Sequence, residues 1–181
     1  MPQSTVSPTL TRTSVKDYYA PVLPYLETVK EKLLNIVPPE SQLLADSLAH
    51  SLGTPGKFLR PVVCLLASGA TGGIQDKHLE TAAVSEMIHI ATLLHDDVLD
   101  DADLRRGKQT VRSLWGNTVA ILSGDYLLAQ ASRKLAQVGN IRVVAIYSDV
   151  LADLCDGEVE QIRASYNIET IDWDSYYRKS I

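Results

Sequence analysis

The sequence is poor in several residue types whose presence would define a class of protein. Its 181 residues include only two cysteines, Cys64 and Cys155, which form no CxxC or Cys/His pattern suited to zinc. Each stands alone in an apolar stretch, so we expect both to be reduced core residues. The longest stretch without charge runs over 15 residues, from Pro61 to Gln75. That is shorter than the about 20 apolar residues of a membrane-spanning helix, so no transmembrane segment is expected.

Basic residues are too few for a protein that follows nucleic-acid phosphates. There are 17 Lys and Arg residues against 22 Asp and Glu residues, which gives a formal net charge of −5. This charge has the wrong sign for a nucleic-acid partner, and none is expected.

Proline is missing from a long region, because all eight prolines lie at or before Pro61. The residues that follow are therefore free to form long uninterrupted helices.

The N-terminal residues lack the pattern of a folded or exported segment. Residues 1–14 are rich in Ser, Thr and Pro and contain no apolar run of the kind found in secretory signals. We expect a disordered tail over 1–14 and one domain over 15–181. The expected location is cytoplasmic, with organellar import through a transit peptide as the alternative.

The apolar residues recur with helical spacing almost throughout, and no stretch alternates strictly enough to predict a strand. The fold class is therefore all-α. The expected helical segments run over about 15–37 (disturbed by Pro21 and Pro24), 40–52, 58–69, 76–101, 117–138 and 141–165, with a last helix from Asp172 to Ile181. The segment over 76–101 has so broad an apolar stripe that it should be buried on most sides.

The densest chemical feature is HDDVLDDADLRRG, which starts at His95 and has five carboxylates within eight positions, followed by two arginines. Asp96 and Asp100 are spaced i, i+4, so both lie on one helix face about 40° apart. Like charges at this spacing repel, and a divalent cation removes the conflict. Mg²⁺ prefers carboxylate oxygens and often binds one or two of them together with substrate phosphates. Asp96 and Asp100 are thus the expected metal ligands.

Four basic residues and a histidine could hold an anion near this motif. Lys57 and Arg60 stand at the start of a predicted helix, where the backbone N–H groups and the dipole also favour negative charge. Together with Arg105 and Arg106 they supply four cations, enough to hold a diphosphate. His89 lies two helical turns before Asp96 and on the same face.

These pieces resemble one family. The run GKFLRP, then HIATLLHDDVLDDADLRRG, SGDYLLAQA and LCDGEVEQ is similar to the first half of a trans-isoprenyl diphosphate synthase, also called a polyprenyl synthetase. The resemblance covers roughly residues 15–181. It implies the N-terminal half of the isoprenoid synthase helical bundle. It also implies a Mg²⁺-dependent prenyltransferase that elongates an allylic diphosphate by head-to-tail 1′-4 condensation with isopentenyl diphosphate, and a homodimer.

The resemblance also implies roles for individual residues. Asp96 and Asp100 match the catalytic carboxylates that hold Mg²⁺ on the allylic diphosphate, with Asp97 in support. Arg105 matches a contact to the allylic diphosphate, and Gln161 matches a polar group on the allylic side. The residues that match the isopentenyl diphosphate site are Lys57, Arg60, His89 and Arg106.

Two further expectations follow from the resemblance. Ala91 and Thr92 are small at the level where shorter-chain synthases place an aromatic ring, so a medium- to long-chain (solanesyl-like) product, above C15, is expected, and Ala91→Phe should shorten it. The family's second aspartate-rich motif does not occur in these residues. The piece by itself is therefore expected to be a truncated domain that is catalytically inactive.

Three alternatives stay open at this point. A synthase-like partner subunit without catalysis would share the fold, although it would have no reason to keep the metal and diphosphate residues. A metal phosphohydrolase of the HD type would use His95-Asp96 with His78 or His89, but it does not explain Asp100 or the arginine pair. A terpene cyclase also uses DDxxD, but it has no need of GKFLRP and LRRG.

Overall fold

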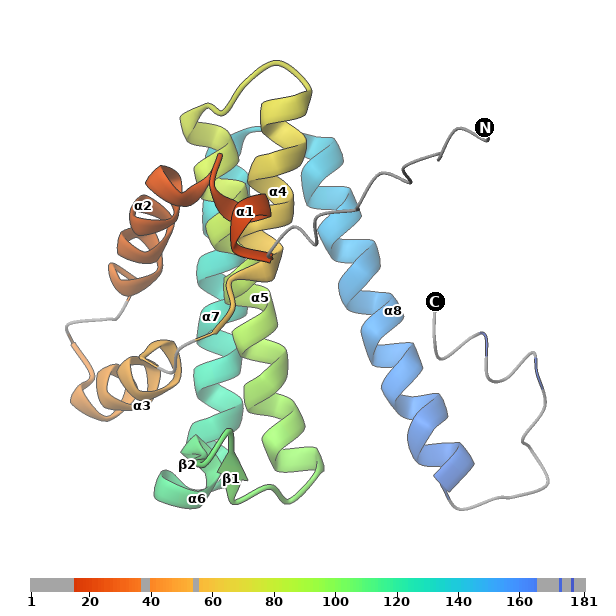
Figure 1. Ribbon diagram of the computed structural model, residues 1–181. Helices are drawn as coiled ribbons and strands as arrows, with labels where there is room; N and C mark the ends of the chain where they lie inside the picture. Colours follow the sequence, from red (N-terminus) through yellow and green to blue (C-terminus); the bar gives the residue numbers. More distant parts are fainter. Residues whose placement is uncertain (1–14, 37–39, 54–55, 166–172, 174–176, 178–181) are drawn as a thin grey trace, which may run out of the picture. The chain divides into compact units, whose positions relative to one another are not determined.

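The computed structural model describes residues 15–36, 40–53, 56–165, 173 and 177, which are almost entirely α-helical (Figure 1). This confirms the all-α expectation, while the expected tail over 1–14 lies outside the described residues. The elements in chain order are α1 (Val15–Tyr19), α2 (Leu23–Leu34), α3 (Gln42–Leu52), α4 (Leu59–Ala70), α5 (Asp76–Leu99), β1 (Leu104–Arg105), β2 (Lys108–Gln109), α6 (Val111–Trp115), α7 (Asn117–Val138) and α8 (Ile141–Ser165).

The chain divides into two compact units, Met1–Lys134 and Leu135–Ile181. The first unit holds α1 to α6 and most of α7. The second holds the end of α7 and all of α8. None of the helices in the described residues combines the length and the apolarity needed to cross a bilayer.

The helix boundaries follow the local sequence closely. The two longest C-terminal helices, α7 and α8, have the expected bounds. The segment expected over 15–37 is split, because α1 ends at Tyr19 and α2 starts at Leu23 with Pro24 in its first turn. Ser41 caps α3 by accepting a hydrogen bond from the Leu44 N–H at 3.4 Å. The expected helix from Asp172 lies outside the described residues except for Trp173 and Tyr177.

Helix α5 is the centre of the first unit and contacts α2, α3, α4 and α6 (Figure 1). Its apolar residues are buried on several sides, as the broad stripe predicts. The buried residues of α5 are Ala82, Ala83, Val84, Glu86, Met87, Ile88, Ala91, Leu94 and Asp97. Two of them, Glu86 and Asp97, are acidic.

Helix α7 is tied to the first unit by small residues and polar contacts. Ser123 is buried and shares a 2.7 Å hydrogen bond with the buried Ser47 of α3. The His95 Nε2 donates to the Ile121 carbonyl at 3.2 Å. A Cβ on Gly124 would lie 2.3 Å from that same Nε2, so only glycine allows the imidazole to approach α7 this closely. These contacts fix the C-terminal half of α5 against α7.

Two details differ from the sequence-based expectations. A short antiparallel hairpin pairs Leu104 with Gln109 and Arg105 with Lys108, although no strand was expected. Its strands are too short for an alternating pattern to show in the sequence. Cys155 is exposed rather than part of the core, and Cys64 is only partly buried, so apolar neighbours in sequence did not mean burial here.

Candidate functional site

The C-terminal end of α5 presents two carboxylates that no cationic side chain of the described residues binds. Asp96 is half-buried and Asp100, the C-cap residue of the helix, is exposed. In the described part of the chain neither side chain has a hydrogen bond or an ion pair. Burial raises the pKa of Asp96, and the carboxylates of Asp100 and Asp97 add to this effect while Arg105 and His95 oppose it. The pair is thus an electrostatically unfavourable arrangement that a cation would relieve.

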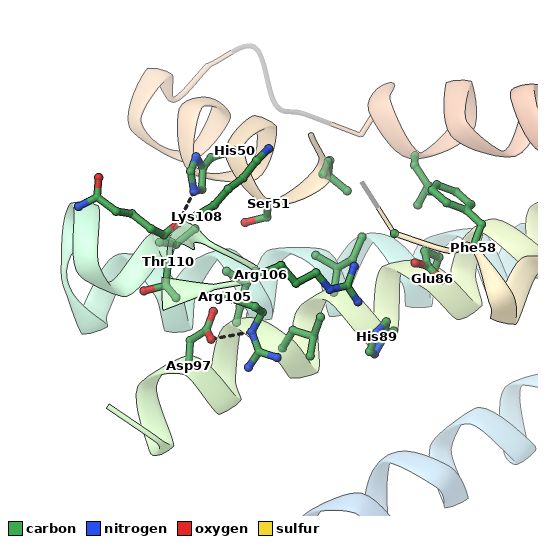
Figure 2. A pocket seen from close by; sticks show the side chains of 18 residues that line it. His50, Ser51, Phe58, Glu86, His89, Asp97, Arg105, Arg106, Lys108 and Thr110 are labelled. Carbon is green, nitrogen blue, oxygen red and sulfur yellow. Dashed lines mark hydrogen bonds and ion pairs between the residues drawn. The ribbon is translucent and has the colours of Figure 1, made fainter. Parts of the chain in front are cut away.

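Asp97 lies in a different environment from its neighbour in sequence. Its side chain is buried, and its Oδ1 accepts a hydrogen bond from Arg105 Nε at 2.7 Å (Figure 2). The expectation that Asp97 supports the metal stays a prediction, because the structure brings it to Arg105. This pair anchors Arg105 through Nε, and its two Nη groups have no bond to any residue that the structure describes.

The hairpin β1–β2 orients the two arginines. Arg106 and Gly107 form the turn, with φ values of 53° and 79°. A left-handed conformation is uncommon for a residue other than glycine, and here it separates the directions of two consecutive side chains. Figure 2 shows Arg106 reaching toward Glu86 while Arg105 reaches Asp97. The hairpin thus delivers its two guanidinium groups to two different places.

A pocket of about 90 Å³ lies between α3, α5 and the hairpin, inside the first unit (Figure 2). Its polar lining includes four of the expected site residues, namely Asp97, His89, Arg105 and Arg106, together with Glu86, His50, Lys108 and Thr110. Its apolar lining includes Leu33, Phe58, Ile90 and Leu94. The pocket therefore combines basic and acidic side chains with apolar surface.

Glu86 is a buried carboxylate in this cationic surrounding. It is 7% exposed, and its Oε2 is the buried side-chain oxygen that finds no hydrogen-bond partner among the described residues. Burial raises the pKa of Glu86, while the charges of Arg60 and Arg106 counteract this. A Cβ on Gly56 would lie 3.5 Å from Glu86 Oε1 and 3.7 Å from Arg106 Nη1, so both side chains converge on Gly56.

His89 is held neutral beside the arginines. Burial lowers the pKa of His89 to about 4, and the charges of Arg60, Arg106 and Arg105 act in the same direction. A neutral imidazole at physiological pH can donate one hydrogen bond to an anion without adding charge. An anion bound to the arginines would remove part of the cause of the shift.

The start of α4 supplies the remaining basic residues. Its N-cap, Phe58, has φ 51°, a left-handed turn that places the Phe58 ring in the pocket lining. Arg60 is exposed, and its charge acts on both Glu86 and His89. Lys57 is exposed and is not among the pocket-lining residues. Arg60 and Arg106 thus act electrostatically on the same two side chains, Glu86 and His89. The assignment of Lys57, Arg60, His89 and Arg106 to isopentenyl diphosphate stays a prediction.

The residues expected to set product length differ in accessibility. Ala91 is fully buried, whereas Thr92 is half-buried and its Oγ1 donates to the His89 carbonyl at 2.9 Å. A phenylalanine at position 91 would therefore overpack the core of the first unit. Gln161 lies on α8 in the second unit, exposed, where its Nε2 donates to Glu158 Oε2 at 3.5 Å. Its expected place on the allylic side stays a prediction.

The donor set at the end of α5 fits Mg²⁺ better than a transition metal. No three His, Cys, Asp or Glu side chains in the described ranges are grouped to enclose a metal. Two carboxylates without cation partners suit an ion that takes its other ligands from water and phosphate.

The three histidines of the HD-type alternative are spread out. His78 Nδ1 accepts from the Gln75 N–H at the start of α5, and His78 is separated from His95 by seventeen residues, about 25 Å along the helix. His95 itself packs on α7. This geometry gives no support to the HD-type phosphohydrolase.

Sequence reasoning missed three residues of this region. Glu86 lines the pocket, and its only signal is a charge within the apolar run AAVSEMIHIA. Thr110 is buried and donates to the Ala102 carbonyl at 2.8 Å. Arg112 binds two aspartates of the motif, Asp101 and Asp103. No local pattern indicates the last two, because their roles depend on contacts across the hairpin.

An all-α unit with an aspartate pair that has no cation partner among the described residues, beside a pocket lined by two arginines, has the charges needed to hold a diphosphate together with a divalent metal. Comparison with known proteins makes this specific. Residues 41–181 match the family profile described as polyprenyl synthetase, and the chain belongs to this family.

Individual relatives agree with this membership. The chain is 40% identical over 161 residues to solanesyl diphosphate synthase 1, chloroplastic, of Arabidopsis thaliana, covering 86% of this chain and 39% of the relative. It is 38% identical over 144 residues to heptaprenyl diphosphate synthase component 2 of Geobacillus stearothermophilus, covering 80% of this chain and 45% of the relative. The chain thus spans less than half the length of these relatives.

A solved structure shares the fold. Polyprenyl synthase from Caulobacter crescentus CB15, complexed with calcium and isoprenyl diphosphate, superposes with a TM-score of 0.87 at 27% identity. The match covers 93% of this chain and 51% of that one. The described helices therefore form about half of an isoprenoid synthase bundle, as the sequence led us to expect.

Proposed function

We propose that this site binds two prenyl diphosphates and that, within the complete fold, it extends an allylic diphosphate by one isopentenyl unit at a time. The observation that carries the proposal is the separation of charge around α5. Among the described residues Asp96 and Asp100 have no cation partner, whereas Arg106 lines the pocket and the charges of Arg60 and Arg106 both act on Glu86. Such an arrangement offers one subsite for a metal-bound diphosphate and another for a diphosphate held by the protein alone. The relatives named as solanesyl and heptaprenyl diphosphate synthases support this assignment.

The chain's own residues account for binding and orientation. Asp96 and Asp100 would hold Mg²⁺, which when bound supplies charge neutralisation for a diphosphate leaving group. Arg105, anchored by Asp97 through Nε, directs its remaining N–H groups at the same diphosphate. Arg106 and Arg60 orient isopentenyl diphosphate, and neutral His89 donates a hydrogen bond to it.

The reaction breaks the allylic C1–O bond and forms a bond from C1 to C4 of isopentenyl diphosphate. A proton is then lost from the new chain. No nucleophilic side chain is needed for these steps, because the electrons come from the double bond of the second substrate. Developing charge on the departing diphosphate is the main barrier, and preorganised cations lower it.

Binding of each diphosphate tests the proposal on the 181-residue chain itself. Isothermal titration should show Mg²⁺-dependent binding of an allylic diphosphate that is lost in the Asp96→Asn/Asp100→Asn variant. Isopentenyl diphosphate should bind without Mg²⁺ and lose affinity by about 10-fold or more in Arg106→Gln, since charge-assisted hydrogen bonds are worth about 1.5–3 kcal/mol. Equal binding to all three proteins would contradict the proposal. Turnover by these residues alone is not expected, because they span less than half of the relatives.

Thr92 gives the sharper test of product length. We propose a product above C15, in keeping with the solanesyl and heptaprenyl relatives. Thr92→Phe in the complete enzyme should shorten the product, and Ala91→Phe is the less clean variant because Ala91 is core. An unchanged product distribution with Thr92→Phe would contradict a tunnel at this level.

Assembly and location complete the proposal. We propose a dimer, and the relative named component 2 supports a second chain of either the same or a different sequence. Sedimentation of the protein alone and after co-expression would separate a homodimer from a complex with a synthase-like partner.

A cytoplasmic location stays the proposal, and the chloroplastic Arabidopsis relative supports organellar import as its alternative. A fluorescent fusion would decide between the two.

A further inference from the structure

The aspartate-rich end of α5 holds more carboxylates than a Mg²⁺ pair needs, and each surplus carboxylate is bound by an arginine. Asp97 Oδ1 is bound by Arg105 Nε at 2.7 Å. Asp101 Oδ1 is bound by Arg112 Nη2 at 2.5 Å, and Asp103 Oδ1 by Arg112 Nη1 at 3.0 Å. Three of the five aspartates therefore each contact an arginine. The two without an arginine contact among the described residues are Asp96 and Asp100, the proposed metal ligands.

Arg112 uses every nitrogen of its guanidinium group in this arrangement. Besides the two aspartates, its Nε donates to Asn117 Oδ1 at 3.1 Å, and its side chain is 19% exposed. The residue belongs to α6, whose first turn is fixed by Thr110. The Thr110 Oγ1 accepts from the Ser113 N–H at 3.1 Å and donates to the Ala102 carbonyl at 2.8 Å. Arg112 is thus held in place by its own three side-chain contacts and by the Thr110 hydrogen bonds that fix the start of α6.

The backbone between the metal pair and Arg112 is equally defined. Asp101 directly follows the C-cap residue of α5 and has φ 51°. The Ala102 N–H donates to the Asp97 carbonyl at 2.9 Å, and the Asp101 N–H donates to the Val98 carbonyl at 3.4 Å. This is a Schellman motif, in which glycine usually occupies the left-handed position. Here an aspartate takes it, and Arg112 binds that aspartate's carboxylate.

Stability alone does not account for these ion pairs. The side chains of Asp101 and Asp103 are 81% and 76% exposed, and exposed ion pairs contribute little to folding. Selection between ligands does account for them. Carboxylates one and three residues after Asp100 offer Mg²⁺ the same kind of oxygen as Asp100 itself, and the number of charged ligands tunes metal affinity. A planar fork with several donors is suited to holding two carboxylates at once.

We propose that Arg112 is a positioning residue that withholds Asp101 and Asp103 from the divalent metal, so that the metal binds only at Asp96 and Asp100. The inference rests on the proposed function, since it presupposes a metal at the aspartate pair. It adds a role for Arg112, which neither lines the pocket nor belongs to the pair Asp96 and Asp100. The carboxylates that bind the metal at the end of α5 are then selected in two ways. The sequence determines where aspartates stand, and the arginine contacts determine which of them remain available.

Mn²⁺ binding to the 181-residue chain, followed by electron paramagnetic resonance of the free ion, tests the inference without any turnover. The native chain should show a single class of bound Mn²⁺. Arg112→Gln should add a second class, because two carboxylates are released beside the pair. Arg112→Lys should give an intermediate result, since an ammonium group keeps the charge but cannot bind both carboxylates through a fork.

A rescue variant separates ligand selection from a purely structural role. Asp101→Asn/Asp103→Asn combined with Arg112→Gln should return the single class, because the released ligands are gone. If Arg112 served only to hold the loop, Arg112→Gln would weaken Mn²⁺ binding instead of adding a class of sites, and the triple variant would bind no better. Asp101→Asn/Asp103→Asn with Arg112 intact should change the apparent Kd by less than about threefold, as expected for carboxylates that are not ligands.

Three further outcomes of the Mn²⁺ measurements are informative. A single unchanged class in Arg112→Gln overturns the inference and leaves the proposed function standing. A large loss of Mn²⁺ binding in Asp101→Asn/Asp103→Asn also overturns it, because these residues would then be ligands. No Mn²⁺ binding by the native chain, with or without inorganic diphosphate, contradicts the proposed function and the inference together.

Discussion

The carboxylates at the two ends of α5 differ in their ion pairing. Near the start of the helix, Glu80 is bound through Oε1 by Lys32 and through Oε2 by Lys134, the latter at 3.0 Å. Near the end, Asp96 and Asp100 have no cation among the described residues. The lysines come from helices α2 and α7, so neighbouring helices can supply cations that pair with a carboxylate on α5. The difference is the one that the proposed function requires, with Glu80 contributing to folding and the aspartate pair proposed to bind a metal ion.

The largest effect should come from replacing Asp96 and Asp100, the carboxylates without a cation partner among the described residues. Asp96→Asn/Asp100→Asn should weaken binding of a metal-bound diphosphate by at least about 100-fold, because changing even the partners of metal ligands costs about 10–100-fold. The free energy of unfolding should stay equal or increase, since the fold disfavours the charged form of Asp96. Titration calorimetry and urea unfolding measure the two quantities. A parallel loss of binding and stability would remove the contrast with Glu80.

The opposite result is expected for Glu80→Gln. Its carboxylate is 22% exposed and its two lysines are 19% and 17% exposed. Losing the carboxylate leaves Lys134 without its ion pair and Lys32 with only its pair to Asp76 among the described residues. We expect a loss of about 2 kcal/mol in the free energy of unfolding and no change in metal binding. Glu27→Gln is the matched control, because its pair with Lys30 is more exposed and should be worth less than about 0.5 kcal/mol. Equal effects in urea unfolding would refute the distinction.

Stability should respond to pH with opposite signs at the two ends. Burial alone would raise the pKa of Glu80, but its hydrogen bonds to Lys32 and Lys134 hold it below the ordinary 4.5. Glu80 therefore stabilises the fold above about pH 4.5, and this contribution is lost as the pH falls through the lowered pKa. The pKa of Asp96 is raised above the ordinary 3.8, mainly by burial. Its protonated form therefore favours folding at low pH, and that contribution is lost as the pH rises.

Unfolding curves at pH 7 and pH 3.5 measure this difference. At pH 7, Glu80→Gln should be less stable than the native chain, and Asp96→Asn should be as stable or more stable. At pH 3.5 both differences should shrink. Two variants that shifted in the same direction at both pH values would show that the two carboxylates are not treated differently by the fold.

The smallest effect concerns His89, which lies between the two regions on α5. Burial and the neighbouring arginines lower the pKa of His89 to about 4. Inorganic diphosphate bound to Arg60 and Arg106 should cancel part of the arginine field and raise this pKa by about one unit or more. Histidine ring signals in NMR report the titration directly. A pKa that did not move with diphosphate would place the anion away from this histidine.

Much of this architecture is local in the sequence and could be predicted from it. The bounds of α7 and α8 follow from unbroken apolar periodicity, and the face shared by Asp96 and Asp100 follows from their i, i+4 spacing. The arginine pair and His89 were also found as candidates, and the pocket brings them together. These features depend on spacing within one helix or one motif.

The features that could not be predicted depend on contacts between segments. Arg112 is nine and eleven residues from the aspartates that it binds, across a hairpin whose strands have two residues each. The burial of Asp97 beside the half-exposed Asp96 depends on which face of α5 meets the hairpin. The burial of Ala91 likewise depends on helix packing, so the sequence alone favoured a less suitable test residue.

The most direct test of the central claim locates the metal on α5. Mn²⁺ added in substoichiometric amounts to the isotope-labelled chain, with inorganic diphosphate present, broadens NMR signals near the bound ion. Broadening should centre on the amides of Asp96 and Asp100 and should spare Glu80. Broadening centred on Asp101 and Asp103, or spread evenly over the acidic residues of the chain, would contradict the central claim.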